Sequence, residues 1–150
     1  MNQRKNITLL SLSLILIVLA SGRGSTATVV TPNPVLAFMG SEAYTTGGKD
    51  WTRYKYFVAN AADYPDEMFA AAPALPPCGL NTKASRTWVD IFDSRGVRLY
   101  GFCALGKASD LGKIWFALER DVVPPSYVYI ELNDRQTNTK YKSNLADTVE

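Results

Sequence analysis

The stretch 87–103, TWVDIFDSRGVRLYGFC, decides the fold that the sequence predicts. Two β-rich runs, Thr87–Phe92 and Val97–Cys103, flank four residues typical of a turn, Asp93-Ser94-Arg95-Gly96. Glycine takes a positive φ without strain, and the carboxylate of Asp93 can accept hydrogen bonds from the turn backbone. The pattern therefore predicts a β-hairpin with a type I turn and a following bulge.

Alternation along the second arm assigns its two faces, because successive side chains of a strand point to opposite sides of the sheet. The face that we expect to be inward carries Val97, Leu99, Gly101 and Cys103. The opposite face carries Arg98, Tyr100 and Phe102. We therefore expect Tyr100 and Phe102 to lie away from the core.

Similar short β-rich runs, separated by turn signals, continue along most of the chain. The predicted strands are Val35–Tyr44, Thr52–Asn60, Ser85–Phe92, Val97–Cys103, Lys113–Leu118, Ser126–Leu132 and Thr139–Asn144. Expected inward residues are Tyr54, Tyr56 and Val58 in the second run and Val128, Ile130 and Leu132 in the sixth. The sequence predicts an all-β fold, a seven-stranded antiparallel β-sandwich over residues 35–146.

One long irregular segment, Ala61–Ala84, separates the second and third predicted strands. A single helical turn is expected at Asp63–Phe69, and the prolines that follow prevent its continuation. Long loops in compact domains are usually functional or need fastening. The expected fastening is a disulfide at the end of this loop.

The N-terminus has the layout of a secretory signal peptide over residues 1–22, with Arg4 and Lys5 before the apolar run Ile7–Ala20. That run is shorter than the roughly 20 apolar residues of a membrane span, so an uncleaved anchor is the weaker interpretation. Cleavage after Ala20, Gly22 or Ala27 remains open. Residues 23–34 are expected to be a flexible leader and 147–150 a C-terminal tail. We expect a secreted protein, periplasmic or extracellular.

The charge balance argues against nucleic acid as a partner. The full chain has 16 basic and 14 acidic residues, a net charge of +2. Loss of residues 1–22 removes Arg4 and Lys5 and leaves 14 of each sign. A near-neutral mature chain lacks the basic footprint that binds phosphate backbones or acidic membranes.

Cys78 and Cys103 are the two cysteines of the chain. In an oxidising compartment such a pair is most simply a disulfide, which would stabilise the fold by roughly 3–4 kcal/mol in the chain-entropy model. The other interpretations are two buried thiols or, least favoured, a reactive one.

The chain contains no histidine. Histidine-based nucleophilic sites and most zinc, copper and non-haem iron sites are thereby excluded, and two cysteines cannot form an all-cysteine metal site in one chain. We expect no cofactor and no enzymatic activity; a small carboxylate-based hydrolase is the alternative. The acidic triplet Asp63, Asp66 and Glu67 is a candidate calcium site, although solvated loop carboxylates explain it more simply.

Three segments carry a resemblance to a known family: Tyr54–Asn60, Pro124–Ile130, which looks like the start of strand F with its corner tyrosine, and Tyr141–Asn144. Over residues 35–146 the chain resembles fibronectin type III-like or immunoglobulin-like β-sandwiches. Two features depart from the antibody pattern: the second strand has no tryptophan, and Cys78 precedes the third strand. A different sandwich topology or a small barrel remains open.

Exposed aromatic rings are the best functional signal, since they can stack on a sugar or anchor a protein. Trp51, beside a glycine turn, and the pair Tyr100 and Phe102 are the candidate binding residues, with core packing as the alternative for each. We expect a secreted module that binds a protein or a glycan surface, or else a purely structural envelope component. The oligomeric state is not predicted.

Overall fold

The structure is a computed structural model that describes residues 30–76, 85–103 and 106–149. Its strands are β1 (Leu36–Thr46), β2 (Lys49–Val58), β3 (Thr87–Asp93), β4 (Arg98–Phe102), β5 (Ile114–Glu119), β6 (Tyr127–Asp134), β7 (Thr139–Lys142) and β8 (Ala146–Asp147). Three short 3-10 turns are η1 (Ala61–Asp63), η2 (Asp66–Met68) and η3 (Ala108–Gly112). The all-β prediction is confirmed, and each predicted strand range overlaps one of β1 to β7.

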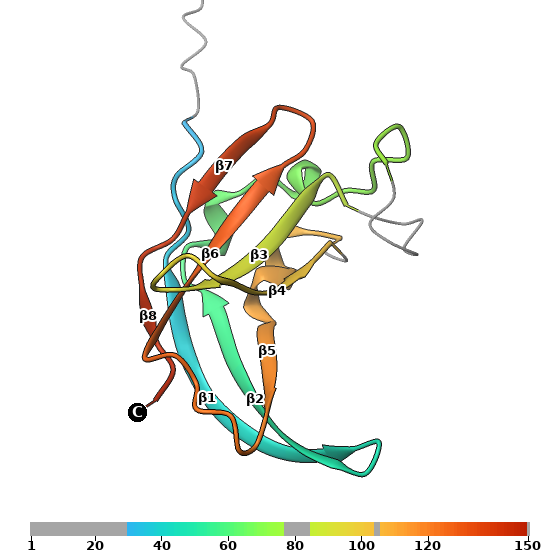
Figure 1. The fold of residues 1–150 in the computed structure, drawn as a ribbon. Coiled ribbons are helices and arrows are strands. Elements are labelled where there is room, and N and C mark those ends of the chain that lie inside the picture. Colours follow the sequence, from blue (N-terminus) through green and yellow to red (C-terminus); the bar gives the residue numbers. More distant parts are fainter. Residues whose placement is uncertain (1–29, 77–84, 104–105, 150) are drawn as a thin grey trace, which may run out of the picture.

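The strands form two antiparallel sheets (Figure 1). One sheet has the order β1-β2-β5, and the other has the order β4-β3-β6-β7 with β8 also paired to β6. Strand β8 was not expected from the sequence. Each sheet is half-buried, so every strand alternates between a face turned toward the other sheet and an outer face.

The core lies between the two inner faces and at one end of the molecule. Its buried residues are Leu36, Tyr54, Tyr56, Val58, Tyr64, Met68, Phe69, Val89, Ile91, Ala108, Leu111, Ile114, Phe116, Val128, Ile130, Leu132 and Ala146. The predicted inward sets in β2 and β6 are therefore confirmed. The rings of Tyr54 and Tyr56 pack against Phe116 of β5, with centroids 5.1 and 6.0 Å apart.

The turn of the β3–β4 hairpin follows the sequence prediction closely, but the predicted faces of its second arm are only partly right. Gly96 has a φ of +85°, and the Asp93 carboxylate accepts hydrogen bonds from the amides of Arg95 (2.9 Å) and Val97 (2.8 Å). Leu99 packs against the core and Cys103 is buried, as expected. The assignment of Phe102 away from the core is wrong, because this side chain packs against the core. A bulge at Leu99 shifts the alternation and places Phe102 and Tyr100 opposite the buried Val89 and Ile91 of β3. The inward assignment of Val97 is wrong, because this residue ends the turn before β4 begins and is exposed.

Described residues 61–76 of the long loop close one end of the sandwich. The helical-turn prediction is confirmed in reduced form, as the two 3-10 turns η1 and η2. Thr87 Oγ1 donates a hydrogen bond to the carbonyl of Met68 (2.5 Å), and the Arg86 amide donates to Ala70 O (2.9 Å). The buried side chains of Tyr64 and Phe69 thus become part of the core.

Segments that were expected to flank the domain also contact it. Tyr64 donates a hydrogen bond to the carbonyl of Pro32 (2.8 Å), and Asn60 donates to that of Asn33 (3.1 Å). At the other end Thr148 is buried, and its amide donates to the carbonyl of Ser126 (3.2 Å). Among the residues that the structure describes, there is no helix with the length and apolar character of a membrane span.

Two sequence predictions concern residues outside the described ranges. The signal peptide, residues 1–22, is one of them. The other is the disulfide: Cys103 is buried, and Cys78 lies outside the described residues. The cross-link therefore stays a prediction.

Candidate binding face

The outer face of the sheet β1-β2-β5 is built by the alternation of β2. Because Tyr54 and Tyr56 point into the core, Trp51, Arg53 and Lys55 point outward. The registers place Tyr44 of β1 opposite Trp51, Glu42 opposite Arg53, and Trp115 of β5 opposite Lys55. Three strands therefore bring aromatic and charged side chains onto one surface.

Three of these side chains and two from β4 form a continuous row, which we call the aromatic stack: Tyr44, Arg53, Trp115, Tyr100 and Phe102. The guanidinium of Arg53 lies between two rings, 4.7 Å from the centroid of Tyr44 and 4.7 Å from that of Trp115. Trp115 stacks on Tyr100 with centroids 5.8 Å apart and an interplanar angle of 23°. Phe102 follows at 6.2 Å from Tyr100. The row thus runs from β1 to β4 and joins the edges of the two sheets.

Glu42 fixes the position of Arg53 in the row. Its carboxylate accepts a hydrogen bond from Arg53 Nη1 at 2.8 Å and another from Lys55 Nζ at 3.0 Å. These bonds and charges, that of Lys55 first, hold the pKa of the Glu42 carboxyl below its usual range. A planar guanidinium held by a carboxylate and two rings loses most of its rotational freedom, so the row is preorganised.

Exposure is highest at two neighbouring members inside the row. Trp115 is 38% exposed and Tyr100 is 42% exposed, whereas Tyr44 and Phe102 are half-buried. Because neighbouring members cover one another's flat faces, edges rather than open ring faces meet the solvent. Deeper on the same surface, Trp51 Nε1 and Arg53 Nε are covered and have no hydrogen-bond partner among the described residues.

The structure brings together two of the three predicted binding residues. Tyr100 and Phe102 are neighbours in the aromatic stack, and Trp51 lies on the same outer face, half-buried beside Tyr44. The sequence interpretation missed Arg53 and the placement of Trp115 next to Tyr100. The alternation of β2 already indicated an outward Arg53, but contact between β4 and β5 joins two sheets and leaves no local signal.

The candidate calcium triplet has another role in the structure. Asp63, Asp66 and Glu67 are exposed, and Asp66 Oδ1 accepts a hydrogen bond from the amide of Ala108 (2.9 Å), which ties η2 to η3. In the part of the chain that the structure describes, no three carboxylate or cysteine side chains lie close enough to hold a metal ion.

A charged hollow of about 340 Å³ lies beside the β1–β2 turn and carries three carboxylates. Glu119 is paired with Lys49 at 2.5 Å, and Asp50 with Arg120 at 3.2 Å. The Glu119 carboxylate raises the pKa of Lys49. Two of the three carboxylates are each neutralised by a cation, and the third, Asp121, interacts electrostatically with Lys49. No pair among them is arranged as an acid and a base.

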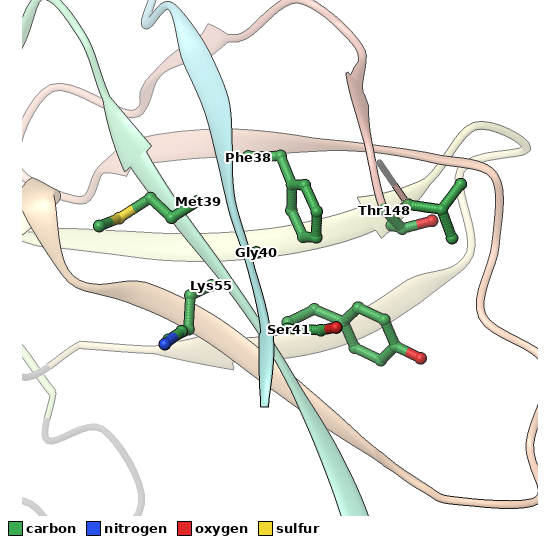
Figure 2. Close-up of a pocket in the computed structure, with 8 residues that line it drawn as sticks. Phe38, Met39, Gly40, Ser41, Lys55 and Thr148 are labelled. Atoms are coloured by element: carbon green, nitrogen blue, oxygen red, sulfur yellow. The ribbon is translucent and has the colours of Figure 1, made fainter. Parts of the chain in front are cut away.

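A third feature is a groove of about 510 Å³ along the edge of β1. Figure 2 shows Phe38, Ser41 and Thr148 on one side of this strand and Met39 and Lys55 on the other. A bulge between Phe38 and Gly40 interrupts the strand here, and Gly40 takes a φ of +117°. The groove therefore wraps around an irregular strand edge next to the C-terminal segment.

No protein-family model matches this chain, and no curated protein or solved structure is significantly similar to it.

Proposed function

We propose that this chain is an exported, non-enzymatic β-sandwich module that binds a partner protein through the aromatic stack. The observation that carries the proposal is the pair of exposed rings, Trp115 and Tyr100, held in place by Arg53 and Glu42. Rigid, preorganised side chains bind with a small loss of conformational entropy. These two large rings are exposed next to each other where the edges of the two sheets meet, as in a surface patch that binds a partner.

A protein partner fits the stack better than a glycan does. Its members are Tyr, Arg, Trp, Tyr and Phe, all residue types that are enriched at protein interfaces, and Trp, Tyr and Arg dominate the residues that carry binding energy. Glu42 and Lys55 flank the row as the charged rim of such an interface would. A sugar ring needs an open aromatic face, but here neighbouring members of the row cover the flat faces.

We further propose a fold of the immunoglobulin-like or fibronectin type III-like kind. Lettered in chain order, strands β1 to β7 correspond to strands A to G of those folds. Their pairs A-B, B-E, C-F and F-G then correspond to β1-β2, β2-β5, β3-β6 and β6-β7. Strand β4 pairs with β3, whereas the fourth strand of constant-type immunoglobulin domains pairs with E.

The proposed module also has its long loop fastened by a Cys78–Cys103 disulfide. The amide of Ser85, seven residues after Cys78, donates a hydrogen bond to the carbonyl of Cys103 (2.9 Å), which supports the proposal. Non-reducing peptide mapping of exported protein should recover the two cysteines in one linked peptide pair. Alkylation of both thiols in the folded protein would refute the cross-link.

Export is proposed from the layout of residues 1–22. Mass spectrometry of the mature protein should show the loss of about 20–27 N-terminal residues, because the small residues that a signal peptidase accepts lie in this range. An intact N-terminus in a membrane fraction would refute the proposal of a secreted protein.

Two tyrosines offer a matched test of the binding face. Tyr100 and Tyr127 are 42% and 46% exposed, but Tyr127 lies outside the aromatic stack. A photo-crosslinking amino acid at position 100, in the exported protein of its native host, should trap one discrete protein, and position 127 should not. Trp115→Ala should then reduce the trapped product at least about tenfold, as expected for a hot-spot residue.

Equal trapping from both positions, or trapping that Trp115→Ala leaves unchanged, would reject the aromatic stack as the binding site. A glycan partner would give a different result. Sedimentation with insoluble chitin, cellulose or peptidoglycan would then retain the wild-type protein and Tyr127→Ala but not Tyr100→Ala, and no protein would be trapped.

A further inference from the structure

Strand β1 is an edge of the sheet β1-β2-β5, and on the side away from β2 most of its backbone has no hydrogen-bond partner among the described residues. At its start, the Asn144 side chain bonds both backbone groups of Leu36, accepting from the amide (2.8 Å) and donating to the carbonyl (3.0 Å). Beyond Leu36, no described residue outside β2 hydrogen-bonds the backbone of β1. Figure 1 shows the end of the β1–β2 hairpin projecting beyond the other strands.

The hairpin turn determines which backbone groups are free. Gly47 and Gly48 form a two-residue turn with φ of +58° and +74°, so Thr46 and Lys49 close it as a hydrogen-bonded pair. Hydrogen-bonded and non-hydrogen-bonded pairs alternate along an antiparallel ladder. The N–H and C=O groups of Ser41, Ala43 and Thr45 therefore point away from β2, toward the free edge.

Natural edge strands are blocked by lysine, proline, inward charges, a β-bulge or a covering segment. The bulge of β1 lies between Phe38 and Gly40, next to the C-terminal segment. Among the described residues, the part of the edge beyond this bulge lacks the other protections. Residues 41–46 read SEAYTT and contain no lysine or proline. Their single charge, Glu42, lies on the outer face and is neutralised by Arg53 and Lys55.

We propose that this edge pairs, antiparallel, with the same edge of a second copy of the chain, about a two-fold axis at Ala43. Since the free groups lie on alternate residues, Ala43 then faces Ala43 of the second copy and Ser41 faces Thr45, and all of them form hydrogen-bonded pairs. On the outer face Glu42 lies opposite Tyr44. The two Glu42 carboxylates become diagonal neighbours, each still neutralised by its own Arg53 and Lys55.

The groove beside β1 supports a second copy of the chain as the partner of this edge. In the proposed register Thr46 of the second copy lies opposite Gly40, so its Gly47-Gly48 turn continues past Met39 and Phe38. These residues, with Thr148 and Val149, line the groove of about 510 Å³ (Figure 2). A turn with no side chains fits a groove at a strand edge better than a bulkier one would, so the hairpin tip and the groove are complementary within one sequence.

The pairing joins two sheets into a continuous one of six strands. A two-fold axis perpendicular to the sheet keeps both outer faces on the same side, so the two aromatic stacks would lie side by side. Such a dimer would bind a repetitive partner with the avidity of two linked sites. The dimer does not depend on the proposed function, since Ala43 faces away from the aromatic stack.

Cysteine cross-linking tests the register. Two paired Ala43 residues have Cα atoms about 5.5 Å apart, within the range of a disulfide. Two Ser41 residues are offset by four positions, about 13 Å along the strands. Mild oxidation of exported Ala43→Cys should therefore give mostly covalent dimer, whereas Ser41→Cys should give less than a tenth as much, and the wild type none.

A second measurement uses proline, because the Ala43 amide bonds nothing in β2. Ala43→Pro should keep the circular dichroism spectrum and leave only monomer in sedimentation equilibrium, whereas the wild type should dimerise. Equal cross-linking of the two cysteine variants would overturn the proposal, as would a dimeric Ala43→Pro. A wild type that stays monomeric at about 1 mM would also overturn the proposal, because a weaker self-association would have no use. The edge would then be left to an extended peptide of another protein.

Discussion

Both outer faces of the sandwich pair aromatic rings with cations, but the cations lie over the rings on one face and between two rings on the other. On the sheet β4-β3-β6-β7, Arg135 lies over Trp88 at 4.4 Å and Lys142 over Tyr129 at 4.0 Å. On the sheet β1-β2-β5, the cation Arg53 lies inside the row, between Tyr44 and Trp115, and the neighbouring rings of Trp115 and Tyr100 remain partly exposed. We call these the capped face and the open face.

The position of the cation decides whether a ring is available to a partner. Tyr129 on the capped face is only 7% exposed and also stacks on Phe92 at 5.2 Å, whereas Trp115 and Tyr100 on the open face are about two-fifths exposed. A cation above a ring replaces solvent there. On the open face the cation lies between Tyr44 and Trp115, and no cation among the described residues covers Tyr100. Composition alone does not distinguish the two faces.

The largest expected effect comes from Asp134, which supports the capped face. Only 2% exposed, it accepts hydrogen bonds from Arg86, Gln136 and Thr137 and so shapes the turn that carries Arg135. Asp134→Ala should lower the free energy of unfolding by about 3 kcal/mol or more, because Arg86 loses its buried partner. Urea denaturation at pH 7 measures this. A loss below about 1 kcal/mol is what an exposed ion pair contributes, and it would contradict the proposal that Asp134 supports the capped face.

The same carboxylate predicts how stability depends on pH. Burial opposes its ionisation, but the hydrogen bonds from Arg86, Thr137 and Gln136 prevail and lower the pKa of Asp134 to about 2, from an ordinary 3.8. A depressed pKa stabilises the fold above the ordinary value, and the stabilisation disappears as the pH falls from about 4 to 2. Denaturation midpoints from pH 6 to 2 should therefore fall less steeply in Asp134→Asn than in the wild type.

The second effect concerns the cation of the open face. Arg53→Met should lower the free energy of unfolding by about 1–2 kcal/mol, since it removes two ring contacts and the ion pair with Glu42. Arg53→Lys should restore only part of this, because an ammonium cannot stack flat between two rings. The comparison variant is Arg135→Met on the capped face, which loses one ring contact and the hydrogen bonds that the guanidinium donates to the carbonyls of Ser85 (3.4 Å) and Pro76, but no ion pair with a described residue. Equal losses in Arg53→Met and Arg135→Met would contradict the difference between the faces.

The strands could be predicted from the sequence because period-two alternation is a local property, as in Tyr54-Lys55-Tyr56. The aromatic stack could not, because it depends on Tyr100 and Trp115 meeting across the edges of two sheets, a contact set by tertiary packing. Strand β8 is only two residues long, Ala146–Asp147, with no β-branched or aromatic residue to mark it. The buried role of the loop residue Phe69 was hidden because one helical turn shows no periodicity.

A third, smaller effect compares two equally exposed tyrosines. Tyr100→Ala removes ring contacts with Trp115 and Phe102, and should cost about 1 kcal/mol in unfolding free energy. Tyr127→Ala removes no ring contact with a described residue and should stay within about 0.5 kcal/mol, as surface substitutions do. Thermal unfolding followed by circular dichroism measures both. A larger loss for Tyr127→Ala would show that the row adds nothing to the stability of the open face.

The smallest expected effect is that of Lys142, whose ammonium covers Tyr129 from the solvent side. Lys142→Met should lower the free energy of unfolding by only about 0.5–1 kcal/mol, because the lysine is exposed and water replaces it. Its more informative readout is exposure: acrylamide should quench tyrosine emission more strongly once the cation is gone. Lys140→Met, which breaks the exposed ion pair with Glu131 at 3.4 Å, is the control and should leave quenching unchanged. Equal quenching in both variants would mean that strand packing, and not the lysine, covers the rings of the capped face.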